Sequence, residues 1–299
     1  MLTKQPRILA VVVTFLPRTD FLLPLLDQLR KQCTEVLVVD NTPRARDDAF
    51  EQIQQIESGS QPRLVRLGDN AGIAAALNVG LEVAMAEGFD YALLSDQDSL
   101  PDAGMVAGLL RAGEELAQAG HNVALVGPLI RDLVTAQDYP FQTRIRGRLF
   151  YGHALPTRTK QNISAYTLIT SGSLVSLPAL RQVGPMQEAL FIDYVDSEWC
   201  LRAIAKGYDI YGTGHAILNH RMGDDEFDVW YFGWRKMSKY SPLRLYYRFR
   251  NFVYLLKLPH VPAGWKLRAS WYWLGNLYAY TVYSDARVAA IRAIARGKI

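Results

Sequence analysis

Cysteine is scarce in this sequence, and its apolar runs are short. The 299 residues include two cysteines, Cys33 and Cys200, which form neither a CxxC pair nor a disulfide pattern. We therefore expect a reducing, cytoplasmic compartment. The apolar run Ile8–Phe15 is too short to span a bilayer and carries no cleavage site of small residues. No stretch reaches about 18 uninterrupted apolar residues, which argues against a transmembrane helix.

Acidic residues are nearly absent from the end of the chain. From Trp230 to Ile299 there are 13 Lys or Arg and one acid, Asp285, whereas residues 1–229 hold 20 basic and 28 acidic residues. The same tail holds 17 of the 33 aromatic residues. This asymmetry indicates an anionic partner. Because Trp and Tyr favour the headgroup layer, we expect a membrane surface, and the acids of the body count against nucleic acid.

The first half alternates apolar β-branched runs with helical patterns, which predicts an α/β fold with an open, mostly parallel sheet flanked by helices. The expected strands are Ile8–Thr14, Val36–Val39, Arg63–Leu67, Tyr91–Leu94 and Val123–Val126. The expected helices are Phe21–Lys31, Ile73–Glu87 and Asp102–Ala119.

The pattern changes after Pro128. We expect a hairpin or a mobile loop in Phe141–Gly152, strands at Ala165–Thr170 and Ile210–Leu218, and a helix over Asp196–Lys206. The boundary is placed between Arg221 and Trp230. It separates one α/β domain, residues 1–225, from a basic, aromatic helical extension, residues 226–299.

Polar side chains follow three of the expected strands. They are Thr14, the pair Asp40 and Asn41, and the triplet Asp96-Gln97-Asp98. Ligands of open α/β sheets bind at the carboxyl ends of the strands. Two neighbouring carboxylates repel each other unless a cation compensates, and Mg2+ or Mn2+ would do so and recruit a diphosphate. Turns or an exposed loop are the structural alternative, because Asp and Asn favour turns.

A second acidic segment contains Asp193, Asp196 and Glu198. Asp196 stands where the N-cap of a helix over Ser197–Lys206 would stand, so capping is one explanation. A carboxylate at a helix N-terminus stays ionised, which suits a general base. The neighbouring acids would raise its pKa toward useful basicity.

A histidine ends the last expected strand of the body. His220 is a candidate third metal ligand beside Asp98. A lone histidine is more often structural or exposed, so a role outside metal binding stays open.

The motifs together resemble the family 2 glycosyltransferases of GT-A fold, and within them bacterial rhamnosyltransferases. The resembling pieces stand in family order over about residues 8–252. They are Val11–Phe15, Val38–Asn41, Asp69–Asn78, Ser95–Asp98, Ile169–Ser173, Asp193–Arg202, His220–Gly223 and Tyr246–Asn251.

The resemblance implies roles for individual residues. Those that would border the base and ribose are Thr14, Asp40, Asn41, Asn70 and Asn78. Asp96 would face the ribose or sugar, Asp98 would hold the metal, and Asp196 would be the catalytic base. Val195 stands where the family commonly carries Glu before this base, and Glu198 is expected to compensate.

The implied reaction is inverting transfer of L-rhamnose from dTDP-β-L-rhamnose to a hydroxyl of a saccharide, free or lipid-linked. Arg248 and Arg250 would assist the leaving diphosphate. A UDP- or GDP-linked donor, a sugar-phosphate nucleotidyltransferase and a non-enzymatic membrane-binding protein are the alternatives. The enzyme would work at the inner face of the cell membrane, as a monomer or an oligomer. A chain ending near Pro259 is expected to bind vesicles less while still binding the nucleotide sugar.

Overall fold

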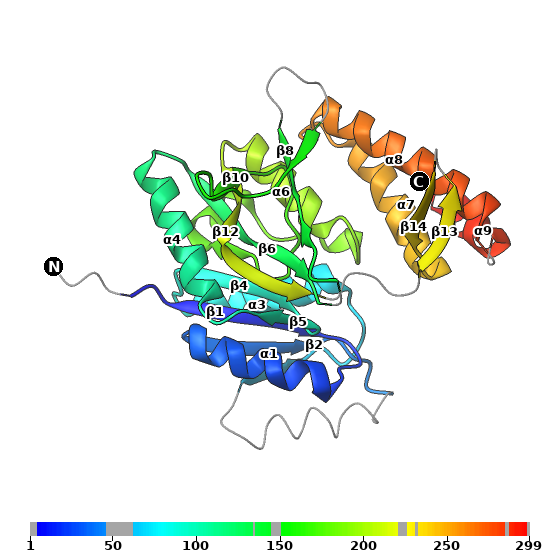
Figure 1. Ribbon diagram of the computed structural model, residues 1–299. Coiled ribbons are helices and arrows are strands. Elements are labelled where there is room, and N and C mark those ends of the chain that lie inside the picture. The colour runs from blue at the N-terminus through cyan, green and yellow to red at the C-terminus, as the bar shows by residue number, and fades with distance from the viewer. Residues whose placement is uncertain are drawn as a thin grey trace.

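A computed structural model describes residues 5–45, 62–133, 135–144, 151–220, 226–230, 233–284 and 287–297. Its body is a twisted sheet with helices on both faces, and a set of helices with a small hairpin stands at one end of that sheet (Figure 1).

Ten strands form the main sheet, with the order β10-β12-β6-β11-β4-β1-β2-β3 and with β5 on β12 and β7 on β6. Their bounds are β1 (Ile8–Thr14), β2 (Glu35–Asp40), β3 (Arg63–Arg66), β4 (Tyr91–Asp96), β5 (Ser99–Pro101), β6 (Val123–Asp132), β7 (Asp138–Tyr139), β10 (Asn162–Ser164), β11 (Leu174–Ser176) and β12 (Asp209–His220). Strands β1 to β4 are parallel, as are β6 and β12, while β11 runs antiparallel between β4 and β6. The predicted mostly parallel α/β sheet is confirmed.

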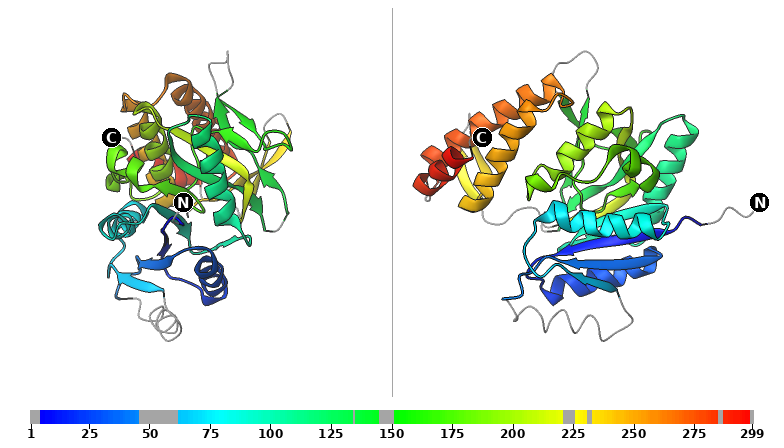
Figure 2. Two further views of the ribbon diagram at one scale, coloured as in Figure 1. Left: turned by 90° about the vertical axis from the view of Figure 1, so that its left-hand side faces the viewer. Right: turned by 180° about the vertical axis from the view of Figure 1, so that it is seen from behind.

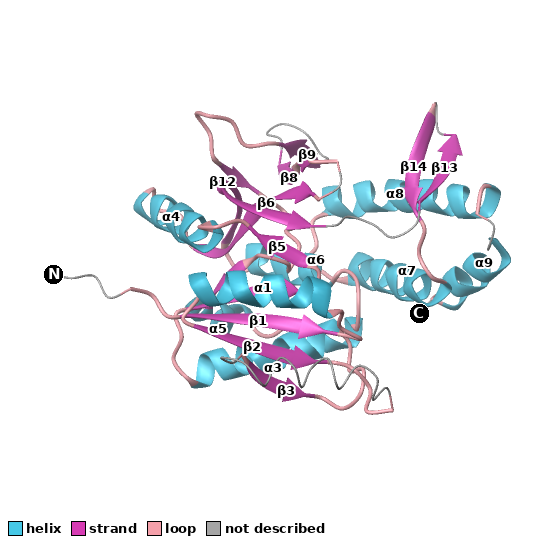
Figure 3. Ribbon diagram, turned by 60° about the horizontal axis from the view of Figure 1, so that its bottom comes forward, coloured by secondary structure: helices cyan, strands magenta, loops and turns pink. Residues whose placement is uncertain are grey.

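Helices cover both faces of this sheet, and strand β1 explains why. Its side chains alternate between two cores: Leu9, Val11 and Val13 face one, and Ala10 and Val12 face the other. The first core is covered by α3 (Ile73–Ala86), α5 (Leu177–Val183) and α6 (Val195–Ala205), with the 3-10 turn η2 (Glu188–Leu190). The second is covered by α1 (Thr19–Gln32) and α4 (Met105–Gln118) (Figure 3).

The strand predicted at Ala165–Thr170 is wrong. The chain leaves β10 at Ser164 and runs as a loop to β11, making only an isolated bridge at Thr167. Ala165 and Leu168 are nevertheless buried, because the loop lies against the sheet. Its apolar character therefore reflects burial and not strand pairing. The hairpin predicted nearby is present, with β8 (Phe141–Arg144) paired to β9 (Tyr151–Ala154).

The carboxy-terminal part begins with a hairpin of β13 (Glu226–Trp230) and β14 (Trp234–Ser238). Three helices follow: α7 (Pro242–Lys257), α8 (Ala263–Val282) and α9 (Arg287–Arg296). They lie beyond the carboxyl end of β1 (Figures 1 and 2). Leu255 and Trp273 of these helices belong to the same buried cluster as the α3 face of the body. Within the described residues, no helix combines the length and apolarity needed to cross a membrane.

Candidate active site

The carboxyl ends of β1, β2 and β3 bring three polar side chains into one row. Thr14 is in register with Asp40, and Asp40 with Arg66. Asp40 is fully buried, and its Oδ1 accepts hydrogen bonds from Thr14 Oγ1 at 3.0 Å and Thr42 Oγ1 at 2.7 Å. Its Oδ2 lies 3.6 Å from Arg66 Nε but accepts no hydrogen bond from the described part of the chain. A buried carboxylate with acceptor capacity left is suited to a donor group on a ligand.

Two asparagines build the turn that opens α3. Asn41 Nδ2 donates to Asn70 Oδ1 at 3.0 Å, and Asn41 Oδ1 accepts from the Ala71 amide at 2.8 Å. Gly72 adopts a φ of 86°, and a Cβ there would stand 2.7 Å from the carbonyl oxygen of Phe191. The turn therefore needs a glycine, and it places Asn41 and Asn70 beside Asp40 at the strand ends.

Asn78 is in a different place from these residues. It is buried on α3, where its Nδ2 donates to the Met186 carbonyl at 3.0 Å and its Oδ1 accepts from the Met186 amide at 2.8 Å. Its Nδ2 also reaches Glu188 at 2.9 Å. These bonds fasten α3 to the segment before η2, so the structure does not bring Asn78 to the row formed by Thr14 and Asp40.

The acidic triplet follows β4 directly. Asp96 ends the strand, Asp98 is exposed, and Gln97 between them holds the end of β1 through two hydrogen bonds with the Phe15 backbone, at 2.8 and 3.0 Å. Desolvation raises the pKa of Asp96 to about 6, and the Asp98 charge adds to this, while the charges of His220 and Arg244 oppose it. The pair of acids therefore favours a cation beside it.

His220 lies next to this triplet because β5 and β12 pair antiparallel, with Ser99 opposite His220. Ser99 Oγ is 3.0 Å from His220 Nδ1 and 2.6 Å from Ser171 Oγ, and Ser171 Oγ accepts from the Asp96 amide at 3.2 Å. This chain of bonds fixes the imidazole and engages Nδ1, so Nε2 is the nitrogen suited to a metal. Sequence reasoning missed Ser99 and Ser171, whose role depends on the pairing of strands far apart in the chain.

No group of three or more His, Cys, Asp or Glu side chains suited to a metal occurs among the described residues. Asp98 directly precedes Ser99, the residue paired with His220 at the edge of the sheet. Mg2+ is held through one or two protein ligands plus phosphate oxygens and water. This donor set, with the neighbouring acid Asp96, therefore fits a divalent ion that arrives with a diphosphate.

Asp196 is not the N-cap predicted for its helix. Helix α6 begins at Val195, and its N-cap is Tyr194 with φ of 64°. The left-handed backbone conformation of Tyr194 starts the helix earlier than the sequence suggested. Asp196 is therefore inside the first turn, where its Oδ1 accepts from the Ser197 amide at 2.6 Å.

The surroundings of Asp196 suit a base. Desolvation raises its pKa to about 6, with further upward contributions from the Asp193 and Asp96 charges and a downward one from the bonds to Ser197. Asp196 lines a cavity of about 270 Å³. The other lining residues are Gly127, Pro128, Ile130, Tyr139, Pro140, Phe141, Gln142, Thr167, Leu168, Ile169, Ser173 and Ser197. A carboxylate with this pKa is ionised near pH 7 and still basic enough to accept a proton.

The other acids of this segment are held by basic partners. Asp193 pairs with Arg244 and with Arg248, each at 3.1 Å. Glu198 is buried and pairs with Arg202 at 2.9 Å, and His260 Nε2 lies 3.2 Å from its Oε1. The structure thus engages Glu198 in contacts inside the fold.

Arg250 uses its guanidinium to hold the chain before Asp193. Its Nη2 donates to the carbonyls of Ala189 and Leu190, the latter at 3.0 Å. Arg248 and Arg250 therefore face different partners. Arg244, which the sequence interpretation missed, is the arginine whose charge acts on Asp96. Its spacing of four residues from Arg248 on a helix was the available signal.

Asn251 is a further residue that the sequence interpretation missed. It is fully buried, and its Nδ2 donates to the carbonyls of Leu190, Ile192 and Asp193 at 2.8 to 2.9 Å. The segment it holds has positive φ at Phe191, Asp193 and Tyr194. An asparagine directly before the apolar run Phe252–Leu256 of α7 was the signal for a buried polar role.

Comparison with known proteins identifies the family. The family model "Glycosyl transferase family 2" matches residues 10–179. The chain belongs to glycosyl transferase family 2. The dTDP-rhamnosyl transferase RfbF of Shigella flexneri is 31% identical over 256 residues, 85% of this chain and 81% of that protein. The galactofuranosyltransferase GlfT1 of Mycolicibacterium smegmatis is 28% identical over 291 residues, 91% of each chain.

Solved structures show the same fold for this family 2 glycosyltransferase. S. aureus TarS 1–349 in complex with UDP-GlcNAc matches with a TM-score of 0.58 at 15% identity, over 97% of this chain and 80% of that one. GalNAc-T7 with UDP, GalNAc and Mn2+ matches with a TM-score of 0.57 at 12% identity, over 82% of this chain and 47% of that one, about half its length. The predicted GT-A fold is confirmed. Membership of the family makes glycosyl transfer the reaction, in place of nucleotidyl transfer.

Proposed function

We propose that this family 2 glycosyltransferase transfers L-rhamnose from dTDP-β-L-rhamnose to a saccharide hydroxyl with inversion. The observation that carries the proposal is Asp196, a desolvated carboxylate with a pKa raised to about 6 at the wall of a cavity, close enough to Asp96 for their charges to interact. The donor identity is supported by the 31% identity to a dTDP-rhamnosyl transferase.

Asp196 acts as the general base. It accepts the proton of the acceptor hydroxyl as that oxygen attacks the anomeric carbon. The diphosphate leaves from the opposite face of the sugar in the same displacement. Because one carboxylate suffices and no covalent intermediate forms, the anomeric configuration inverts. From dTDP-β-L-rhamnose the product is an α-L-rhamnoside.

The leaving diphosphate meets the edge formed by Asp98 and His220. These residues would hold a Mg2+ or Mn2+ ion, which supplies Lewis-acid stabilisation of the growing phosphate charge when bound. Ser99 orients His220 through Nδ1. The nucleoside side of the donor is assigned to Thr14, Asp40, Asn41 and Asn70, because the buried Asp40 Oδ2 accepts no hydrogen bond from the described residues.

The acceptor belongs in the cavity next to Asp196. Tyr139 and Phe141 line it together with apolar residues of β6 and of the loop before β11. Aromatic faces with few charged groups suit the apolar face of a sugar ring. We assign a saccharide acceptor here, carried on a lipid at the inner face of the membrane.

A donor panel tests the donor assignment. Transfer or slow hydrolysis is measured with Mn2+ and dTDP-β-L-rhamnose, UDP-galactofuranose, UDP-GlcNAc and a GDP-linked sugar. The dTDP donor should give the highest kcat/KM, and thermal stability should rise most with dTDP, since ligand binding stabilises by mass action. A higher kcat/KM with UDP-galactofuranose would overturn the rhamnose assignment and favour the activity of the 28% identical relative.

Chelation tests the metal assignment separately. EDTA should abolish transfer, and Mg2+ or Mn2+ should restore it. Asp98→Ala should weaken binding of the nucleotide diphosphate in the presence of Mn2+, while Asp138→Ala, an acid of β7 bonded to Arg131, should leave it unchanged. Full activity in chelator would contradict the metal role of Asp98 and His220.

A further inference from the structure

Helix α8 is apolar on two opposite faces. Its inner face contributes Trp265, Ala269 and Trp273 to the buried core. Its outer face exposes a stripe of apolar residues, called here the α8 stripe: Leu267, Trp271, Leu274, Tyr278 and Val282. Trp271 and Leu274 are each 61% exposed. A helix that is apolar on all sides is normally buried on all sides, so the exposed outer face of α8 indicates an interaction surface.

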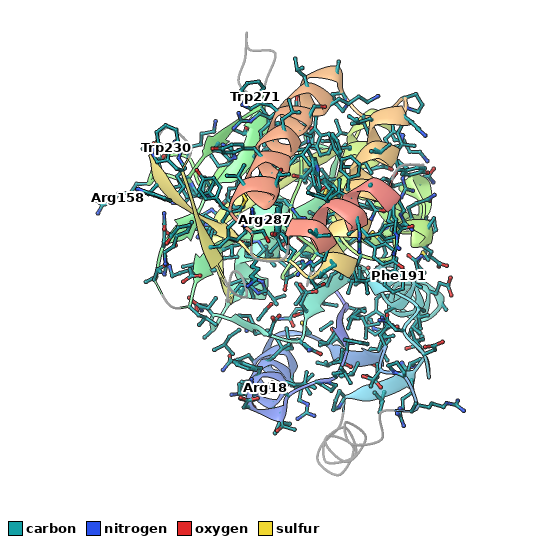
Figure 4. All side chains as sticks on the ribbon, turned by 90° about the vertical axis from the view of Figure 1, so that its right-hand side faces the viewer. Arg18, Arg158, Phe191, Trp230, Trp271 and Arg287 are labelled. Atoms are coloured by element: carbon teal, nitrogen blue, oxygen red, sulfur yellow. The ribbon has the colours of Figure 1, made fainter. Side chains whose placement is uncertain are left out.

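The α8 stripe continues onto the β13-β14 hairpin. Tyr278 lies 5.8 Å from Tyr283, and Tyr283 lies 6.4 Å from Trp234, measured between ring centroids. Trp234 is 71% exposed and pairs in register with Trp230, which is exposed as well. Figure 4 shows Trp230 and Trp271 on the side of the molecule formed by the hairpin and α8. Two elements therefore present one aromatic surface.

The charge around this surface is predominantly positive. Residues 226–299 hold 13 Lys or Arg and three acids. Arg235 of β14 and Arg287, Arg292 and Arg296 of α9 are exposed. Helix α9 contacts both α7 and α8 and exposes Val288 and Ile291 beside its arginines. The apolar stripe is thus accompanied by cationic side chains.

We propose that the α8 stripe and the Trp230-Trp234 end of the hairpin dock on an anionic lipid membrane surface. Tryptophan and tyrosine partition into the headgroup layer, leucine and valine into the acyl boundary, and arginines pair with anionic headgroups. A second copy of the chain fits less well, because pairing this face with itself would bring two arginine-rich surfaces together. No residue of this surface lines the cavity of Asp196, so the inference goes beyond the catalytic assignment.

Binding of the full chain to vesicles tests the proposal. Vesicles of phosphatidylcholine with about a third phosphatidylglycerol should bind the protein at low salt and release it as ionic strength rises. Trp271→Ser with Leu274→Ser should weaken this binding at least roughly tenfold, since burial of each side chain contributes that much. The matched control, Leu23→Ser with Leu155→Ser, removes apolar side chains of similar exposure from the body and should bind normally.

A charge variant separates the electrostatic part. Arg287→Glu with Arg292→Glu should weaken binding by at least about 25-fold and flatten its salt dependence, at about fivefold per basic residue near the leaflet. Arg30→Glu with Arg181→Glu, exposed arginines of α1 and α5, is the control. Thermal unfolding of each variant checks the fold without reference to activity. Vesicle binding equal to wild type in both surface variants overturns the proposal, and so does a wild-type dimer in light scattering that Trp271→Ser with Leu274→Ser converts to monomer.

Discussion

At the residue scale, Asp196 combines two properties that oppose each other. It is desolvated, which disfavours its charged form, yet a base must be charged before it can accept a proton. Hydrogen bonds to Oδ1 from the Ser197 amide at 2.6 Å and the Ser197 hydroxyl at 3.2 Å stabilise the ionised form of Asp196. The second oxygen is the one that would face the acceptor.

Replacing this carboxylate gives the first prediction. Asp196→Asn should retain donor binding and lower kcat by roughly 10²–10⁴, the usual contribution of a positioned base. The measurement is steady-state transfer beside a binding isotherm for the nucleotide diphosphate. Ser197→Ala, which keeps the backbone bond to Oδ1, is the control and should lose far less. Near-normal turnover of Asp196→Asn would move the base to another residue.

The raised pKa predicts a pH dependence of activity. Because Asp196 must be ionised, kcat/KM should rise with pH through about 6 and level off above it. A profile of kcat/KM between about pH 4.5 and 8.5 checks this. A flat profile across that range would contradict the assignment of Asp196 as the titrating base.

The same shift predicts that Asp196 lowers stability at neutral pH. Its pKa is about 6 in the folded chain, against 3.8 for an unperturbed aspartate, so the folded chain binds more protons between these values. The free energy of unfolding therefore falls as pH rises through this window. Asp196→Asn should be more stable than wild type at about pH 7.5 by about 3 kcal/mol, with a smaller gain of about 1 kcal/mol at about pH 4.5. Urea unfolding at the two pH values measures the difference, and an equal or lower stability of the variant at the higher pH would refute it.

At the scale of elements, the segment from Phe191 to Tyr194 leads into α6 and positions Asp196, the proposed base. Three of its four residues have positive φ, which disfavours ordinary side chains. The segment persists because Asn251 holds its carbonyls, Phe191 stacks on Tyr247 at 4.7 Å, and Trp273 Nε1 donates to Tyr194 Oη at 2.9 Å.

Asn251→Ala should therefore affect both stability and catalysis. The carbonyls of Ile192 and Asp193 lose the donor that Asn251 supplies, which costs about 1–3 kcal/mol for each group left unsatisfied, while the Leu190 carbonyl keeps its bond from Arg250. The segment would relax, and kcat should fall while Asp196 is still present. Asn276→Ala is the matched control: it removes a buried asparagine of α8 that bonds to the Tyr272 carbonyl of its own helix. If both variants lose stability and neither loses kcat, the positioning role of Asn251 is wrong.

Sequence alone was sufficient for the elements whose signal is local. The alternation of β-branched strands with helices located β1, β2, β4 and α3, and the acids at strand ends could be assigned to one edge. Prediction from the sequence failed where contacts between residues far apart in the chain determine the local structure. The apolar run at Ala165–Thr170 is buried as a loop, and Tyr194 starts α6 through a left-handed turn that no helix-capping pattern indicates. The bonds of Ser99 to His220 and of Asn251 to the Leu190–Asp193 segment join positions 121 and 58 to 61 residues apart.

At the scale of the whole molecule, some aromatic side chains of the basic tail pack into the core and others are exposed. Trp265 and Trp273 belong to the main core, while Trp271 and Trp234 face outward. The truncation expected from sequence to leave donor binding intact therefore has a different expected outcome. A chain ending at Pro259 lacks both buried tryptophans and the donor to Tyr194.

We predict that this truncated chain loses transfer and unfolds at lower temperature than the full chain. Removing two buried tryptophans costs several kcal/mol, about 3–5 for each large aromatic side chain truncated in a core. Thermal unfolding and sugar transfer measured on both chains test this. Normal transfer by the truncated chain would mean that α8 contributes to membrane contact alone.

The way α7 and α8 hold the Phe191–Tyr194 segment also sets an order in time. A ribosome makes the chain from its amino end, so the strands and both sheet faces of the body emerge before α7 and α8. Asn251 and Trp273 reach the segment only afterwards. A nascent chain can therefore fold the strand ends that carry Thr14, Asp40 and Asp98 early and still lack a correctly placed Asp196, the proposed base. If Asp196 is the base, the chain becomes catalytically competent last, when the helix that carries the α8 stripe docks and Trp273 reaches Tyr194.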